Sequence, residues 1–85
     1  MNNSVCKRFQ DLFETIKGTK STDLKNSMIE IAIGDFEHHL TMLEGFLALG
    51  VGEELIADLK EYSEYFISEE YVPEVIKERI RVITA

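Results

Sequence analysis

The sequence predicts an all-α fold, a compact bundle of four or five short helices, and three observations support this class. Apolar residues recur every three or four positions along most of the 85 residues, which places them on one face of a helix. Strand-like sequence is confined to the last few residues, Ile80 to Thr84. The apolar segments are joined by connections of about two to six residues, as in antiparallel bundles. We therefore expect residues 1–85 to form a single helical domain.

The stretch from Gly34 to Gly50 is predicted to be the central helix. Its apolar side chains form one row and a flanking set, namely Phe36, Leu40, Leu43 and Leu47, with Met42, Phe46 and Leu49 beside them. This arc covers about half of the helix circumference, which is wider than the stripe of an ordinary surface helix. We therefore expect neighbours on more than one side. Asp35 is the predicted N-cap, and Gly34 and Gly50 are predicted to end helices.

Two helices are predicted before this stretch. The first runs from about Ser4 to Lys17, and Gly18 ends it. The second has a less regular apolar pattern and covers residues 23–33, with Ser21 or Thr22 as its cap.

Two further helices are predicted after it. The one that begins near Glu53 has a buried row of Leu55, Leu59, Tyr62 and Phe66, with Ile56 at the edge. Pro73 fits the first position of the last helix, where its missing N–H is no loss. The apolar row of this last helix is Val72, Ile76, Ile80 and Ile83.

The composition favours a cytoplasmic protein without cofactors. A single cysteine excludes an internal disulfide and fits a reducing compartment. The N-terminus has no apolar segment after Lys7 and Arg8, so a signal peptide is not predicted. No apolar run approaches the roughly 18 residues that a membrane span needs.

The acidic residues are concentrated in the middle of the chain. The net charge is −7, and residues 26–76 carry twelve acidic residues against Lys60 alone. Nucleic acid and anionic membranes would be repelled by such a segment, so neither is a predicted direct partner. A basic protein would be attracted to it. The oligomeric state does not follow from these charges.

We expect the partner-binding residues in the most acidic part of this segment. They are Glu53, Glu54, Asp58, Glu61, Glu64, Glu69 and Glu70, with Tyr65 and Tyr71 interleaved. Charge can accelerate the encounter with a basic partner, and tyrosines can supply contact energy. The alternative is an acidic surface that simply faces water. Tyr65 is expected at the margin of the acidic face and not in the core.

No catalytic or metal site is predicted. His38 and His39 are adjacent and point about 100° apart on a helix, so they cannot chelate one ion. Asp35 and His39 have a favourable spacing but supply only two ligands. A packed, hydrogen-bonded core histidine is the favoured interpretation of His39. Cys6 has no visible catalytic base and is interpreted as a small, partly buried residue.

Two features of the apolar surfaces leave alternatives open. Thr41, Gly45 and Ala48 form a strip of small residues that either receives another helix of the chain or provides a flat docking strip. Arg79 lies within the apolar arc of the last helix, and we expect it to pair with a carboxylate.

Two segments carry a resemblance to known proteins. The segment from Ile33 to Leu40 is similar to the turn of glycine and acidic residues that opens a helix in Maf-type immunity proteins. The segment from Glu53 to Pro73 resembles the acidic helix and Tyr-Tyr-Pro segment of nuclease-colicin immunity proteins, with Val72 in place of the second tyrosine. Together they cover under half of the chain. The chain thus resembles small acidic helical bacterial toxin-immunity proteins, which include those of contact-dependent inhibition.

The sequence and this resemblance lead to one functional hypothesis and two alternatives. The hypothesis is a non-catalytic immunity protein that inhibits a cognate toxin domain, a nuclease, through an acidic helical face. The first alternative is a regulatory adaptor or small chaperone that docks a partner helix or self-associates. The second is a DNA-mimic inhibitor of a nucleic-acid-binding enzyme. No nucleophile–base pair or phosphate-binding loop is visible, so an enzyme is not predicted.

Overall fold

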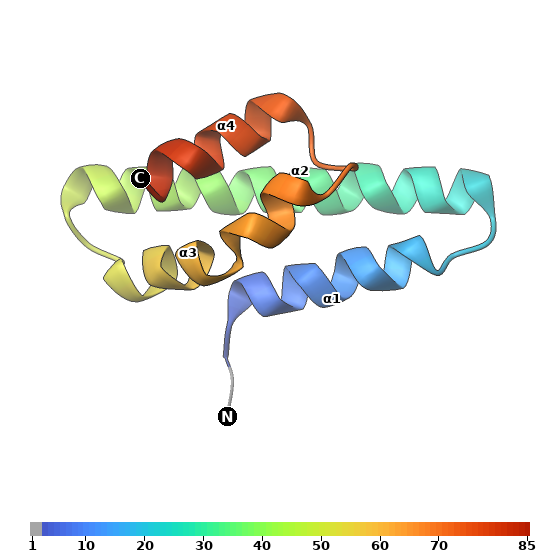
Figure 1. The fold of residues 1–85 in the computed structure, drawn as a ribbon, viewed down its shortest axis with the longest axis horizontal. Helices are drawn as coiled ribbons and strands as arrows, with labels where there is room; N and C mark the ends of the chain where they lie inside the picture. Colours follow the sequence, from blue (N-terminus) through green and yellow to red (C-terminus); the bar gives the residue numbers. More distant parts are fainter. Residues whose placement is uncertain (1–2) are drawn as a thin grey trace.

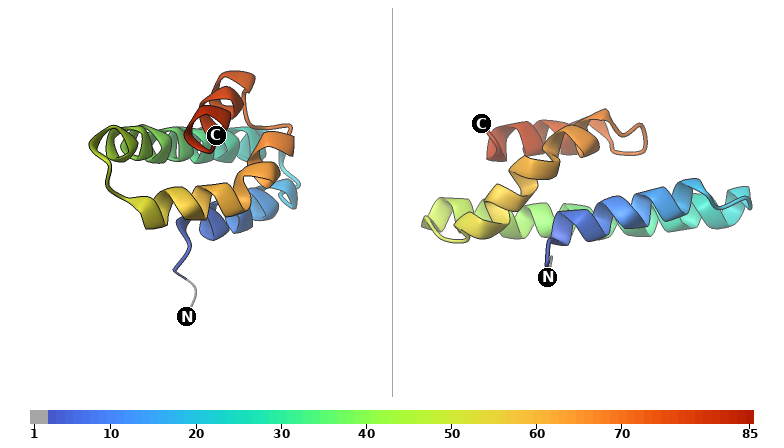
Figure 2. Two further views of the ribbon diagram at one scale, coloured as in Figure 1. Left: turned by 60° about the vertical axis from the view of Figure 1, so that its left-hand side comes forward. Right: turned by 60° about the horizontal axis from the view of Figure 1, so that its bottom comes forward.

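The computed structural model describes residues 3–85, which form four α-helices and no strand. The predicted all-α class is confirmed. The helices are α1 (Val5–Lys17), α2 (Thr22–Leu49), α3 (Glu53–Ser68) and α4 (Glu74–Ile83). As Figure 1 and Figure 2 show, α1 and α2 run antiparallel side by side, α3 crosses them obliquely, and α4 lies beside α2. The molecule is only 19 Å thick along its shortest axis. In Figure 1, α1 lies below α2 and α4 lies above it.

Most helix ends lie where local signals predicted them. The hydroxyl of Ser4 accepts a hydrogen bond from the backbone N–H of Lys7 at 2.9 Å, and Ser21 caps α2 in the same way. Gly50 ends α2 in the left-handed region with φ 72°. Pro73 lies one position earlier than predicted, at the N-cap of α4.

The predicted break at Gly34 and Asp35 is wrong, because residues 22–49 form one continuous helix of 28 residues. Asp35 is an exposed interior residue and not an N-cap. The buried positions Ala32, Phe36 and Leu40 continue at four-residue spacing across the glycine. Packing of this row therefore outweighs the cost of an interior glycine, which is about 1 kcal/mol.

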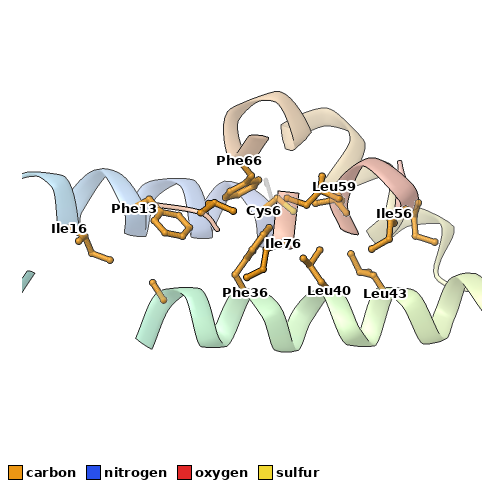
Figure 3. Close-up of a cluster of buried hydrophobic side chains, with 14 residues drawn as sticks. Cys6, Phe13, Ile16, Phe36, Leu40, Leu43, Ile56, Leu59, Phe66 and Ile76 are labelled. Atoms are coloured by element: carbon orange, nitrogen blue, oxygen red, sulfur yellow. The ribbon is translucent and has the colours of Figure 1, made fainter. Parts of the chain in front are cut away.

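The core lies between α2 and the other three helices (Figure 3). Phe36 of α2 stacks on Phe66 of α3 with ring centroids 4.5 Å apart, and Phe13 of α1 contacts Phe66 edge-on at 6.0 Å. The predicted apolar row of α4 is buried as expected. In α3 the buried residues are Ile56, Leu59 and Phe66, whereas Leu55 and Tyr62 are half-buried. Because α3 crosses the other helices obliquely, Ile56 faces the core more fully than Leu55 does.

The expectation that α2 has neighbours on more than one side is confirmed, because α1 and α4 pack on different sides of it and α3 also contacts it. Part of its apolar surface nevertheless remains exposed. Phe36, Leu40 and Leu43 are buried, but Met42, Leu47 and Leu49 are exposed. Leu47 lies on the same helical face as Phe36 but near the C-terminal end of α2, whereas Met42 and Leu49 lie on a face that the other described helices leave exposed.

Arg79 joins α4 to α2, which confirms the predicted ion pair. Its guanidinium donates two hydrogen bonds to Glu44, at 3.0 and 2.7 Å, and one to Glu37 at 3.2 Å. A further bond of 3.0 Å goes to the hydroxyl of Thr41. A planar guanidinium on a carboxylate in this forked arrangement fixes the position of both helices. The pair also raises the pKa of Arg79 and lowers the pKa of Glu44.

In the strip of small residues on α2, Thr41 is bound by Arg79 of α4, but no helix of the described chain packs closely at Gly45 and Ala48. Gly45 and Ala48 are exposed, and a Cβ built on Gly45 would meet no atom within 4 Å. Close approach of another helix within residues 3–85 is therefore wrong as an explanation, and the docking alternative remains.

Candidate functional site

The outer surface of α3 carries several exposed carboxylates near one another. Burial of Ile56, Leu59 and Phe66 fixes the orientation of α3, and residues on the opposite arc then point to solvent. Four exposed glutamates lie on this arc, namely Glu53, Glu54, Glu61 and Glu64. On a helical projection they together span about 100°. We call these four residues the α3 acidic face. Among residues 3–85, none of the four is in an ion pair.

The α3 acidic face borders two open hollows. The first, of about 440 Å³, lies between the start of α1 and α3 and is lined by Ser4, Val5, Glu54, Leu55, Asp58 and Glu61. The second, of about 430 Å³, lies at the turn between α2 and α3 and is lined by residues 50–55. Glu54 lines both hollows. Three carboxylates line the first hollow, those of Glu54, Asp58 and Glu61, and a basic side chain of a partner that enters it would meet them.

Asp58 forms part of the wall of the first hollow but has a structural role of its own. One carboxylate oxygen accepts a hydrogen bond from the hydroxyl of Ser4, and the other accepts one from the backbone N–H of Cys6 at 3.0 Å. Asp58 therefore caps the N-terminus of α1 from α3. Partial burial alone would raise the pKa of Asp58, but these hydrogen bonds outweigh it and the pKa is lowered.

Cys6 is completely buried, beyond the partial burial that was predicted. Burial raises the pKa of its thiol, and the negative charge of Asp58 raises it further. A thiol with a raised pKa stays protonated and is a poor nucleophile.

Glu69 is not part of an exposed surface. Only 4% of the residue is exposed, and its carboxylate forms an ion pair with the ammonium group of Lys17 on α1. Its other oxygen accepts a hydrogen bond from the backbone N–H of Tyr71 at 3.4 Å. Glu69 thus connects the end of α1 to the connection between α3 and α4.

The two tyrosines are also engaged within the chain. Tyr65 is half-buried, its ring packs edge-on against Phe66 at 5.2 Å, and its hydroxyl donates to the carboxylate of Glu14. Burial and the Glu14 hydrogen bond raise the pKa of Tyr65. Tyr71 is half-buried, with the ammonium of Lys25 5.5 Å from its ring centroid. Glu70 is exposed between these contacts and separate from the α3 acidic face.

The nine predicted partner-binding residues therefore fall into two groups. The α3 acidic face and Glu70 are exposed, whereas Asp58, Glu69 and the two tyrosines hold parts of the fold together. Glu14 and Lys17, which bind Tyr65 and Glu69, were not singled out in the sequence. Their only sequence signal was a polar position on the first helix, which does not identify a partner 50 residues away.

His39 is buried, as predicted, but the prediction of a hydrogen-bonded ring is wrong for one of its nitrogens. Nε2 has no hydrogen-bond partner among residues 3–85. The ring lies 5.9 Å from that of Phe9. Burial lowers the pKa of His39, and the charge of Asp58 opposes this shift only in part. His38 is exposed.

Residues 3–85 contain neither a metal-binding cluster of side chains nor a membrane-spanning helix. No group of three or more histidine, cysteine, aspartate or glutamate side chains is arranged to hold a metal ion within this range. None of the helices described here is both long enough and apolar enough to cross a bilayer.

Comparisons with protein-family models, with curated proteins and with solved structures found no match to this chain.

Proposed function

We propose that this chain is a non-catalytic binding protein that neutralises a basic protein partner, a toxin domain with nuclease activity, through the α3 acidic face. The observation that carries the proposal is a group of four exposed, unpaired glutamates on one helix, beside a hollow that two of them line. The resemblance to bacterial immunity proteins supports the same function.

The distribution of ion pairs distinguishes this face from the rest of the acidic surface. Glu37 and Glu44 are paired with Arg79, and Glu14 and Glu69 are paired with Lys17. On α3 the only basic residue is Lys60, and it forms no ion pair within residues 3–85. Four like charges close together repel one another, and a basic partner would relieve this repulsion. Such a face would also accelerate the encounter with that partner.

Neutralisation would require no chemistry by this chain. A nuclease binds the phosphates of its substrate with lysine and arginine side chains. The α3 acidic face would pair with those side chains, and one of them would enter the hollow lined by Glu54 and Glu61. The substrate would then be excluded from the same surface.

The test is a pull-down of the tagged protein from its native host, washed at roughly 50 mM and roughly 500 mM salt, since the higher concentration shortens the screening length to a few ångströms. Bound proteins are identified by mass spectrometry. We expect one basic partner that is lost or much weakened at high salt. The purified partner should degrade nucleic acid, and this chain should inhibit it.

Matched charge reversals identify the face. The double variant Glu61→Lys and Glu64→Lys should weaken binding at least about tenfold, which corresponds to about 1.4 kcal/mol. The double variant Asp23→Lys and Glu30→Lys changes the net charge equally on exposed residues of α2 and should bind nearly as well as the original chain. Asp58 is unsuitable for this test because it caps α1. Equal losses for both double variants, or a partner retained at high salt, would exclude the proposal.

A further inference from the structure

The side of α2 that faces away from the core carries exposed apolar residues in a regular row. Phe36, Leu40 and Leu43 point toward the other helices (Figure 3). On the uncovered side, the exposed fractions are 54% for Leu24, 66% for Ile31, 39% for Met42 and 76% for Leu49. At 100° per residue, these four side chains lie within about 20° of one another. Large apolar side chains aligned in this way along one helix indicate a contact surface.

The row extends into a heptad-like stripe with alternating steps of three and four residues. Its members are Leu24, Met28, Ile31, Asp35, His38, Met42, Gly45 and Leu49, and we call them the outer stripe. It spans about 38 Å at 1.5 Å per residue, or nearly four heptads. Five of the eight positions are apolar side chains, with Asp35 and His38 at the centre and Gly45 toward the end. Apolar residues at this spacing are typical of a helix that packs along a second helix, and a polar pair at such positions can set its register. Asp35 is the only acidic member.

The outer stripe is complementary to itself when a second copy runs antiparallel. With Asp35 of one copy opposite His38 of the other, Ile31 lies opposite Met42 and Leu24 lies opposite Leu49. Met28, which is half-buried and also packs against the core of its own chain, then lies opposite Gly45. Every pair is symmetric about the midpoint between residues 36 and 37, which is the requirement for a two-fold interface.

The polar pair at the centre favours this arrangement over a parallel one. Asp35 and His38 are exposed, and within residues 3–85 neither side chain is in a hydrogen bond or an ion pair. In the antiparallel arrangement each carboxylate meets an imidazole of the other copy. In a parallel arrangement Asp35 would face Asp35, and like charges opposite each other are destabilising.

Two glycines leave room for a second backbone, Gly45 within the stripe and Gly34 beside it. Both are exposed, and a Cβ at either would meet no atom within 4 Å.

We propose that the chain forms an antiparallel homodimer through the outer stripe of α2, with Asp35 of each copy against His38 of the other at the two-fold axis. This inference does not rest on the proposed inhibitory function, because it concerns a different surface and a different partner. The two can fail independently.

The first test is sedimentation equilibrium of the purified chain over a concentration range from roughly 1 µM to 1 mM. We expect a transition to twice the mass of the chain. Ile31→Glu places two charges in the interface and should weaken dimerisation at least about tenfold. Val75→Glu is the matched control, because Val75 is a β-branched helix residue with 68% exposure on α4, away from the stripe. It should dimerise like the original chain.

The second test determines the orientation. His38→Glu alone should weaken the dimer, since the introduced carboxylate would face Asp35 of the other copy. Adding Asp35→Lys in the same chain should restore the dimer, because the introduced ammonium and carboxylate groups then face each other in the antiparallel arrangement only. Circular dichroism verifies that each variant is folded. A chain that is monomeric throughout the range, equal effects of Ile31→Glu and Val75→Glu, or a double variant as weak as His38→Glu would overturn the proposal.

Discussion

His39 is the residue whose surroundings fit its chemistry least well. It is 7% exposed among aromatic and aliphatic side chains, and its Nε2 has no partner within residues 3–85. A buried polar atom without a hydrogen bond costs about 1–3 kcal/mol. Burial lowers the pKa of its imidazole from the ordinary value of 6.5, so the folded state binds a proton less readily than the unfolded state.

We predict that His39→Leu stabilises the chain and that the gain grows at acidic pH. Well above pH 6.5 the imidazole is neutral in both states, and the gain of about 1 kcal/mol comes from the unpaired nitrogen. As the pH falls below 6.5, the unfolded state takes up a proton that the folded state resists, and the original chain loses stability. The variant His39→Leu has no imidazole at this position and therefore does not lose stability in this way. Urea unfolding at roughly pH 5, 6, 7 and 8 measures the difference.

The variant His39→Gln is the control for this prediction. Glutamine does not titrate, so the growth of the difference below pH 6.5 should appear with both substitutions. The gain at about pH 8 should appear with leucine alone, because glutamine buries a polar group again. A difference that stays constant from about pH 8 to about pH 5 would show that folded and unfolded chains protonate His39 equally.

Side chains with structural roles could not be identified from the sequence, because their partners are distant along the chain. Asp58 binds Ser4 and Cys6 at separations of 54 and 52 residues, and Tyr65 binds Glu14 at a separation of 51. On a helical projection Asp58 has the same appearance as Glu54 and Glu61. Only the oblique crossing of α3 over α1 separates the capping carboxylate from the exposed ones.

Among the helices, α2 shows where local signals succeed and where they fail. Ser21 and Gly50 were predicted to bound helices, and the structure confirms both, because a cap needs only the few residues around it. The break at Gly34 was also predicted from a local signal. At Gly34 the helix continues because the row of Ala32, Phe36 and Leu40 is buried against the core. The sequence does not show which residues bury this row, so the stabilisation could not be weighed against the glycine.

Two glycine-to-alanine substitutions compare a glycine inside a helix, Gly34, with a glycine in a turn, Gly52. Gly34→Ala should raise the free energy of unfolding by up to about 1 kcal/mol, because alanine is the better helix former and the site has open space. Gly52→Ala should lower it by about 1–2 kcal/mol or more. Gly52 has φ 72°, and a Cβ there would lie 2.7 Å from Cδ2 of Phe46. Thermal unfolding of both variants provides the measurement.

The two variants serve as controls for each other, since both replace glycine by alanine. A loss of stability in Gly34→Ala would show that residue 34 needs a conformation outside the α-helix, and that the predicted break exists after all. An unchanged Gly52→Ala would show that the turn between α2 and α3 can adopt a second conformation.

For the whole molecule, the two outer surfaces differ in chemistry. The α3 acidic face is charged and unpaired, whereas the outer stripe of α2 is apolar with one acidic residue. Both lie outside the contacts that hold the four helices together. Arg79, Asp58 and the pair of Lys17 and Glu69 form those contacts, and each involves residues from two different parts of the chain. Substitutions on either surface should therefore affect association without unfolding the chain.

This separation gives a prediction for the isolated protein. Glu61→Lys and Glu64→Lys together should leave the free energy of unfolding equal to that of the original chain or higher at roughly 20 mM salt, because they reduce the repulsion within a chain of charge −7. Any gain should vanish at roughly 500 mM salt, where surface charges are screened. Urea unfolding at the two salt concentrations measures both effects.

The pair Asp23→Lys and Glu30→Lys again provides the comparison, since it changes the net charge by the same amount. Both double variants should show the same salt-dependent trend in stability, but only the pair on α3 should lose the basic partner. A large loss of stability confined to Glu61→Lys and Glu64→Lys would mean that these carboxylates support the fold. The α3 acidic face would then have a structural reason to exist, and its proposed role in neutralising a toxin would lose its main argument.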